Sequence, residues 1–353
     1  MSSLTDNGTQ QEKVSMLILN DRDLSSGFGG QASFIKNLDP WLRQKFALTY
    51  VTLQSVWLKQ KLVPIRLAYL IRVFLFLIRH RHNFDIVLSH TPEASYAVSF
   101  FRIPFMHIFH GNLNPVIMST FWYGKYFRRL FGHFEARIIK KAGHLFTVGE
   151  FRPEAEKLFN PVSIDMPGLA GTVRKDFIYA GRLETVKNVD KIIELYSQLP
   201  ADIKAQNKLN IIGTGSQEKH LQKLVYNLDL NNNVAFHGLT DNDTAIRMIA
   251  NSRILIIASS SEGFPMVIAE SLTCGTPVIA TDVGDIRSVL KDGYNGFLLE
   301  SAYSSVDFSE KVRVILANYN TFSFNSIQSA RIFDAKVSAN SLISACKKLI
   351  RSH

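Results

Sequence analysis

Cysteine is scarce in this chain of 353 residues, which contains only Cys274 and Cys346. Two cysteines cannot form the disulfide framework of a small secreted domain, and no Cys-x-x-Cys pair or zinc-ligand spacing is present. We therefore expect a reducing compartment. The composition, 46% hydrophobic and 20% charged, excludes disorder as the main state and is ordinary for a globular protein.

Long apolar runs are also absent. The first twelve residues are polar, and the apolar run 14–19 is too short for the core of a secretory signal. The most apolar window, 62–78, is interrupted by Arg66 and Arg72, whereas a spanning helix needs about 20 apolar residues. We expect neither a secretory signal nor a membrane span.

Acidic residues are outnumbered in the first half of the chain. The formal net charge is +10, of which residues 1–170 carry +8 and residues 171–353 carry +2. A basic half is typical of a protein that faces nucleic acid, anionic lipid or a phosphorylated substrate. No nucleic-acid recognition module is present, so we expect no such partner.

Apolar runs of strand length alternate with helical patterns along the whole chain, which predicts an α/β fold with parallel sheets covered by helices. The predicted strands are 14–20, 47–53, 86–90, 106–110, 145–148, 177–180, 209–213, 234–237, 254–258, 277–281 and 296–299. The helices predicted between the later strands are 188–199, 216–228, 241–251 and 265–273.

The stretch 160–174 has prolines, glycines and no periodicity, and it is the predicted linker. We expect two Rossmann-like domains, at residues 1–165 and 171–333, and a terminal segment at 334–353. In open α/β sheets, ligands bind beyond the carboxyl ends of the strands, where helix N-termini offer free N–H groups to anions.

The strongest functional pattern follows the strand that ends at Ala258. A polar loop leads to Pro265, which suits a first helical turn because its missing N–H would be unpaired there. Glu262 then lies in the loop and Glu270 in the helix. Taken alone, these two glutamates could be ordinary surface carboxylates.

Backbone amides near Gly263, Phe264 and Met266 lie at the start of the same helix, where they would face a bound anion. Gly275 suits the position just past the helix end.

A second pattern follows the strand 177–180. Arg182 and Lys187 flank a short loop, and Asn188 is placed to cap the next helix. An arginine fork and a lysine point charge together suit a diphosphate, although two solvated cations are an equal alternative.

A third pattern is the pair Gly213 and Gly215, which permits close backbone approach at a strand-to-helix turn. Taken alone, such a pair favours tight-turn packing over ligand binding.

The ordered motifs GRLxxxKN, GTGxxxxxL and EGFPxxxxE, the last followed by GTPVIAT, resemble the retaining nucleotide-sugar glycosyltransferases of family 4. The resemblance covers most of residues 175–300. It implies the GT-B fold, in which two Rossmann-like domains face each other across a cleft, with a last helix near 335–351 that crosses back to the first domain. The glycine-rich loop with Gly29 and Gly30, and the pair His110–Gly111, also resemble family features.

The resemblance implies roles for these residues. Arg182 and Lys187 would hold the donor diphosphate, and Glu270 would bind the ribose hydroxyls. Glu262 would lie beside the donor sugar, with Gly263, Phe264, Pro265 and Met266 offering amides and contacts to it. Gly29, Gly30, Gly213 and Gly215 would let backbone approach the donor, and His110 would lie near the sugar; alternatively, His110 is a hydrogen-bonded core histidine.

Two departures from the family pattern stand close together. Asp285 and Ser288 occupy positions where a glycine and a glutamate are frequent in the family. The string Asp21-Arg22-Asp23 and Asp243 are weak metal-binding signals outside a matching fold, so we expect no metal and no cofactor beyond the nucleotide-sugar substrate.

The acceptor side is basic and aromatic. No acidic residue occurs at 41–84, and in 120–144 the residues Tyr123, Phe127, Phe134 and Ile138 share one helix face. This pattern suits an interfacial helix on anionic lipid, or equally a core helix with a solvated basic face.

We therefore expect a retaining hexosyltransferase of cell-surface polysaccharide or glycolipid synthesis, such as lipopolysaccharide or capsule. Its partners would be a nucleotide-sugar donor, a saccharide acceptor that is lipid-linked, and the anionic inner face of the cytoplasmic membrane. The alternatives are a soluble glycosyltransferase with a non-lipid acceptor and a non-catalytic nucleotide-sugar-binding protein.

Overall fold

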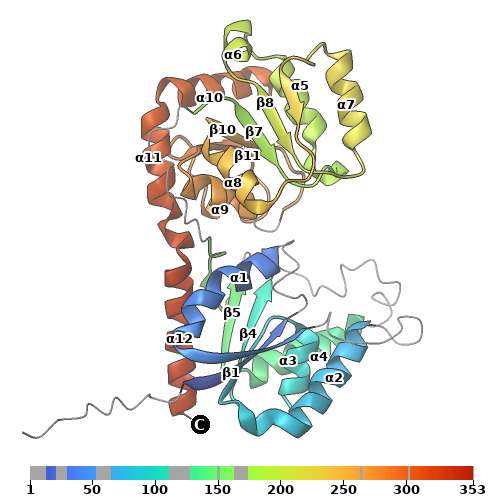
Figure 1. Cartoon of the computed structure of the whole chain (residues 1–353), viewed down its shortest axis with the longest axis vertical. Coiled ribbons are helices and arrows are strands. Elements are labelled where there is room, and N and C mark those ends of the chain that lie inside the picture. Colours follow the sequence, from blue (N-terminus) through green and yellow to red (C-terminus); the bar gives the residue numbers. More distant parts are fainter. Residues whose placement is uncertain are drawn as a thin grey trace, which may run out of the picture.

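The computed structural model describes residues 13–20, 30–52, 65–110, 128–148, 152–162, 174–262, 265–300 and 303–352. These residues form two six-stranded sheets, and every strand pair in them is parallel (Figure 1). Helices cover both faces of each sheet, which confirms the predicted fold class.

The first sheet has the strand order β2-β1-β3-β4-β5-β6. Its strands are β1 (Val14–Asn20), β2 (Phe46–Thr52), β3 (Ile86–Ser89), β4 (Phe105–His110), β5 (His144–Val148) and β6 (Glu156–Leu158). All five strands predicted here are present with ends that differ by at most one residue. The short edge strand β6 was not predicted, because three residues carry no readable pattern.

Two helix layers bury the two faces of this sheet. One face packs against α1 (Gly30–Arg43) and α12 (Ala335–Arg351), and the other against α2 (Ile65–His80), α3 (Pro92–Val98) and α4 (Arg128–Lys141). None of the helices in the described ranges combines the length and the apolar character that crossing a membrane requires.

The apolar face predicted for residues 120–144 turns inward where the structure describes it. Phe134 stacks on Tyr96 with ring centroids 3.9 Å apart, and the Ile138 side chain is fully buried. These two residues are therefore core, as the alternative interpretation of this helix held. Tyr123 and Phe127 lie outside the described residues.

The second sheet has the strand order β12-β11-β10-β7-β8-β9. Its strands are β7 (Phe177–Ala180), β8 (Leu209–Ile212), β9 (Val234–Phe236), β10 (Ile254–Ile257), β11 (Val278–Thr281) and β12 (Gly296–Leu299). The covering helices are α5 (Val189–Ser197), α6 (Ala201–Gln206), α7 (Glu218–Asn227), α8 (Asn242–Ala250), α9 (Met266–Thr273), α10 (Ser305–Ala317) and α11 (Tyr319–Ala330). The predicted strands again match to within one residue.

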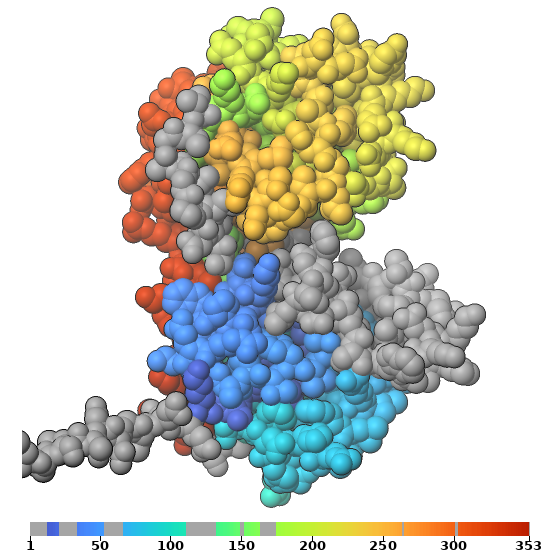
Figure 2. Space-filling view, viewed as in Figure 1, coloured from blue at the N-terminus to red at the C-terminus, as the bar shows by residue number. Residues whose placement is uncertain are grey.

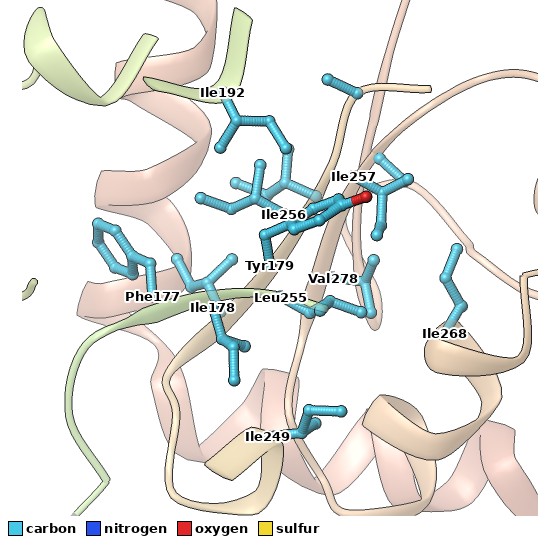
Figure 3. Close-up of a cluster of buried hydrophobic side chains, with 14 of the residues drawn as sticks. Phe177, Ile178, Tyr179, Ile192, Ile249, Leu255, Ile256, Ile257, Ile268 and Val278 are labelled. Atoms are coloured by element: carbon cyan, nitrogen blue, oxygen red, sulfur yellow. The ribbon is translucent and has the colours of Figure 1, made fainter. Parts of the chain in front are cut away.

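The central strands of this sheet are apolar on both faces because helices cover both sides. All four residues of β10 are buried, and the β7 side chains from Phe177 to Tyr179 are buried beside them. Figure 3 shows these side chains in one apolar cluster with Ile192 of α5, Ile249 of α8 and Ile268 of α9. This packing fixes where the carboxyl ends of β7 and β10 lie.

The last helix joins the two halves. It follows α11 of the second half through a 3-10 turn at Arg331–Phe333, and then runs along the first half beside α1 (Figure 1). Leu342, Ala345 and Cys346 are buried in the same apolar cluster as Met16 and Ile18 of β1. The chain that completes the first half therefore comes from the far end of the sequence.

Three polar contacts lie at the junction of the two halves. Val162 forms a β-bridge with Asp334, the Asn37 side chain donates to the Pro161 carbonyl at 2.7 Å, and Lys157 pairs with Asp285 at 2.8 Å. The first residues of the predicted linker are thus packed rather than loose, and residues 163–173 lie outside the described ranges.

The unusual Asp285 acquires a physical role in this arrangement. It follows β11 in the second half, and its partner Lys157 is in β6 of the first half. The departure from the family pattern therefore supplies one side of an ion pair between the halves, and it places the carboxyl edge of the second sheet against the first half.

We expect Leu342→Ala to lower the free energy of unfolding of the first half by about 2–5 kcal/mol, because it leaves a cavity under α12. All three tryptophans of the chain, Trp41, Trp57 and Trp122, lie in this half. Urea unfolding followed by tryptophan fluorescence therefore measures it. Val337→Ala on the same helix, whose side chain is exposed, is the control and should change the value by less than about 0.5 kcal/mol.

Candidate functional site

The candidate site lies at the carboxyl edge of the second sheet, where the strand order reverses. β7 is the first strand, and the chain then builds β8 and β9 on one side of it and β10 to β12 on the other. The boundary between β7 and β10 is therefore the topological switch point, where ligands of open α/β sheets bind.

An ion pair spans this boundary. The Lys187 ammonium lies 2.5 Å from Glu262 Oε1, and the Ser259 hydroxyl donates to the same oxygen at 2.7 Å. Both side chains are mostly buried, with 17% of Lys187 and 10% of Glu262 exposed. The structure thus brings together two residues that the sequence placed 75 positions apart.

Backbone contacts join the same two loops. The Ser260 amide donates to the Val186 carbonyl at 2.9 Å, and the Asn188 side chain donates to the Ala258 carbonyl at 2.9 Å. Asn188 was predicted to cap α5, but its side chain makes no capping bond. Its left-handed backbone (φ 46°) instead turns the amide across to the neighbouring strand end.

The two predicted glycines hold a third loop against the first. A Cβ on Gly213 would lie 1.8 Å from the Gly181 carbonyl oxygen, and one on Gly215 would lie 2.3 Å from the Leu183 carbonyl oxygen. No side chain fits at either position. The loops after β7 and β8 are therefore packed backbone to backbone beside the ion pair.

Arg182 is the exposed cation of this group. Its backbone carbonyl accepts a hydrogen bond from the Tyr179 hydroxyl at 2.9 Å. In the described part of the chain its guanidinium has no carboxylate within ion-pair distance. The neighbouring Glu184 is instead bound to the Ser216 hydroxyl at 2.6 Å, which holds the pKa of that carboxyl below its usual value.

The helix after the Glu262 loop begins one residue later than expected. Pro265 is the N-cap, with extended backbone, and Met266 is the first helical residue. Gly275 has a left-handed φ of 72° just past the helix end, as predicted. Gly263 and Phe264 lie outside the described residues.

Glu270 lies in the second turn of α9 and is partly buried. Desolvation by the surrounding protein raises the pKa of its carboxyl to about 7. No hydrogen bond joins it to Lys187, Glu262 or Arg182 among the described side chains. Glu270 is therefore a carboxyl that titrates near neutrality on the helix that follows the Glu262 loop.

The carboxyl edge of the first sheet carries a histidine pair. His110 ends β4 and His90 follows β3, and their rings are stacked with His90 Nδ1 2.9 Å from His110 Nε2. The edge of the Phe34 ring packs against both. Gly30 is the first residue of α1, the helix that contains Phe34. Gly29 lies outside the described residues.

Burial keeps these histidines neutral. Desolvation lowers the pKa of His110 to about 4. It lowers the pKa of His90 well below its usual value, and the nearby His110 lowers the pKa of His90 further. His107 in the same strand is bonded to the Ser95 hydroxyl at 2.7 Å, and burial lowers its pKa to about 3.

Sequence reasoning missed His90 and Ser259. Both follow apolar strands directly, in the runs LSH and ASS, so the expectation that ligands bind beyond the carboxyl ends of the strands applies to them as well. Neither residue was selected, because each meets its partner only in the folded protein. His90, for example, lies beside His110 because β3 and β4 are neighbours in the sheet, although they are separate in the sequence.

No group of three or more His, Cys, Asp or Glu side chains within the described ranges is arranged to hold a metal ion. Asp21 and Asp23 lie outside these ranges.

Residues 168–330 match the family model described as "Glycosyl transferases group 1". N-acetyl-alpha-D-glucosaminyl L-malate synthase of Bacillus anthracis is 31% identical over 126 residues, which are 36% of this chain and 32% of that protein. The chain matches about a third of the length of such curated relatives.

Solved structures share the whole fold. HepE of Anabaena in complex with UDP has a TM-score of 0.71 at 17% identity, covering 95% of this chain and 100% of that one. The lipopolysaccharide outer core galactosyltransferase WaaB has a TM-score of 0.65 at 18% identity, covering 95% and 99%. The predicted GT-B architecture is confirmed.

Acidification is expected to destabilise the first half. His90, His107 and His110 have lowered pKa values when folded but about 6.5 when unfolded, so below pH 6.5 the unfolded state binds more protons. The free energy of unfolding should fall by about 1.4 kcal/mol per pH unit for each histidine between about pH 6 and 4.5.

Urea unfolding across this pH range, followed by tryptophan fluorescence, checks the effect. His90→Gln should give a shallower pH dependence, whereas His220→Gln at an exposed site of α7 should leave it unchanged. An unchanged slope for His90→Gln would contradict the assignment.

Proposed function

Because residues 168–330 match the model of the group 1 glycosyl transferases, we propose that this protein is a retaining glycosyltransferase. It transfers a hexose-type sugar from a nucleotide-diphosphate sugar to a saccharide acceptor. The observation that carries the proposal is the Lys187–Glu262 pair at the switch point, with the exposed Arg182 beside it. Residues 171–333 form the donor domain, residues 1–165 the acceptor domain, and residues 334–353 the helix that links them.

The donor diphosphate is held by Arg182 and Lys187. An ammonium has three N–H donors, so Lys187 keeps Glu262 and still binds a phosphate oxygen. The Arg182 fork is free to bind two phosphate oxygens together. Gly213 and Gly215 let the loops after β7 and β8 pack backbone to backbone, and the diphosphate would lie against this backbone. Gly29 and Gly30 would approach the diphosphate from the opposite half.

The rest of the donor contacts the remaining predicted residues. Glu270 accepts hydrogen bonds from the ribose hydroxyls. Glu262 and the backbone amides of Gly263 and Phe264 contact the sugar. The amide of Met266, which follows Pro265, contacts it as well.

His110 approaches the sugar from the first half as a neutral imidazole. Its Nε2 is engaged by His90, which leaves Nδ1 as the atom available to a hydroxyl.

Catalysis is mainly electrostatic. As the bond between the anomeric carbon and the diphosphate oxygen breaks, Arg182 and Lys187 stabilise the negative charge on the leaving group. The acceptor hydroxyl attacks on the same face, and a donor phosphate oxygen takes its proton, so the configuration is retained. No separate catalytic base is required by this scheme.

We also propose UDP as the nucleotide and a lipid-linked saccharide as the acceptor. HepE was solved with UDP, and WaaB acts on the lipopolysaccharide outer core, which supports both choices by analogy of fold. The protein would then work at the inner face of the cytoplasmic membrane in lipopolysaccharide or capsule synthesis. A soluble enzyme with a non-lipid acceptor would keep full activity without membranes, and a non-catalytic binding protein would have none.

A thermal-shift screen against UDP-, GDP- and ADP-sugars tests the donor. Transfer from the best binder to lipid-linked and free saccharides tests the acceptor, and NMR of the product gives the anomeric configuration. An inverted product, or no stabilisation by any nucleotide sugar, would refute the proposal.

Lys187→Ala and Glu262→Ala should each lower kcat/KM for transfer by about 10²–10³-fold, because each removes a charge that acts on the leaving group or the sugar. Lys311→Ala is the matched control: Lys311 pairs with Asp307 at the same 2.5 Å, but on α10. Its activity should be unchanged. Full transfer by either site variant would contradict the site assignment.

Donor binding should strengthen as the pH rises through about 7. The carboxyl of Glu270 has its pKa raised to about 7, and only the ionised form accepts hydrogen bonds from both ribose hydroxyls with both oxygens. Calorimetric Kd values for UDP between pH 6 and 8 measure the effect. Glu270→Gln should bind weakly at every pH, and a retained pH dependence in this variant would assign the titration to another group.

A further inference from the structure

We propose that the outer face of α2 is the docking surface through which the first half binds an anionic lipid bilayer. The inference deepens the proposed membrane attachment by naming the helix that makes it. The surface consists of an apolar row, here called the α2 stripe, with arginines beside it. The stripe is made of Leu67, Ile71, Leu75 and Ile78.

The α2 stripe is a continuous apolar row on an exposed helix face. Its residues are spaced by four, four and three positions, so they fall within about 80° of arc on an α-helix. Their exposed fractions are 47%, 46%, 59% and 51%. The opposite face of the same helix, with Tyr69, Val73 and Leu77, is buried on the sheet.

A helix that carries apolar side chains on two opposite faces normally buries both faces. Here only one side has a partner in the described structure, although α2 lies at the surface of the molecule (Figures 1 and 2). Phe100, after α3, extends the apolar area with 51% of its surface exposed, and its ring lies 6.1 Å from that of Phe74 in α2. Among the described residues, the stripe and the Phe100 ring therefore form one exposed apolar patch.

The charges around the stripe identify the partner. Arg72 and Arg79 are seven residues apart and share one flank of the helix, and Arg81 and His82 follow its end. No acidic residue occurs anywhere from 41 to 84. An apolar stripe with an exclusively basic flank matches a bilayer, which offers acyl chains and anionic headgroups side by side.

The direction of α2 connects this surface to the candidate site. A helix that follows a parallel strand starts at the carboxyl edge of the sheet and runs back towards the amino edge. Arg66, in the first turn of α2, is paired with the buried Glu93 of α3 at 3.1 Å, which fixes that end. The stripe thus begins at Leu67 beside the ligand-binding edge, where a lipid-linked acceptor would leave the membrane.

Cosedimentation with vesicles tests the proposal. The full-length protein should bind vesicles of phosphatidylcholine mixed with phosphatidylglycerol at low salt. The double variant Ile71→Gln, Leu75→Gln should lower the partition coefficient by about tenfold or more, since two inserted side chains are lost. The control Val306→Gln, Phe324→Gln removes two apolar residues of the second half that are even more exposed, and this variant should bind as the unaltered protein does.

The basic flank has its own signature. Arg72→Gln and Arg79→Gln should each weaken binding to the anionic vesicles about fivefold and leave binding to pure phosphatidylcholine unchanged. Circular dichroism and melting temperature verify that each variant is folded.

Three results would overturn the proposal: no binding by the unaltered protein, equal binding by the stripe variant, or a stripe variant that changes the oligomeric state in sedimentation velocity. The last result would assign the face to a second copy. Vesicle binding requires no donor, and transfer to a free saccharide requires no vesicle. A failure of the docking surface is therefore distinguishable from a failure of the proposed transferase activity.

Discussion

The contact between Lys187 and Glu262 organises the carboxyl edge of the second sheet. Each charge is mostly removed from water, and each is tolerated because the other lies 2.5 Å away. Around this pair, the loops after β7, β8 and β10 are held by backbone hydrogen bonds and by glycines that leave no room for a side chain. The result is a site whose charged groups are fixed before any ligand arrives, with Arg182 left exposed beside them. Preorganisation of this kind is what electrostatic stabilisation of a leaving group requires.

The two halves are separate in their cores but not in their chain. The first half is completed by α12, which arrives from the end of the sequence, and the junction is fastened by the Lys157–Asp285 pair and the Val162–Asp334 bridge. A half that is completed by α12 cannot fold fully until residues 335–351 are made. These contacts also hold the two sheets together at the junction. A reaction that uses groups from the carboxyl edges of both sheets would depend on them.

In the first half, polar side chains are buried at one place and apolar side chains are exposed at another. At the strand ends, His90 and His110 are buried together and kept neutral by desolvation. On α2, apolar side chains that could have been buried are left in water. Under the proposed function, the first would orient a hydrogen bond inside the site, and the second would contact the bilayer. Both features lie in the half that would receive the acceptor.

The sequence by itself determined the strands. A parallel strand that is covered on both faces must be a short apolar run, and such runs can be recognised directly in the sequence. It also determined which loops carry charge and glycine, because these follow the strands directly. Only the tertiary structure decided which of these residues meet. Lys157 and Asp285 are 128 positions apart, and His90 follows β3 whereas His110 ends β4, so no local pattern links the members of either pair. The exposure of the α2 stripe was equally hidden, because an apolar face has the same sequence whether a neighbour covers it or not, as the buried Phe134 and Ile138 of α4 demonstrate.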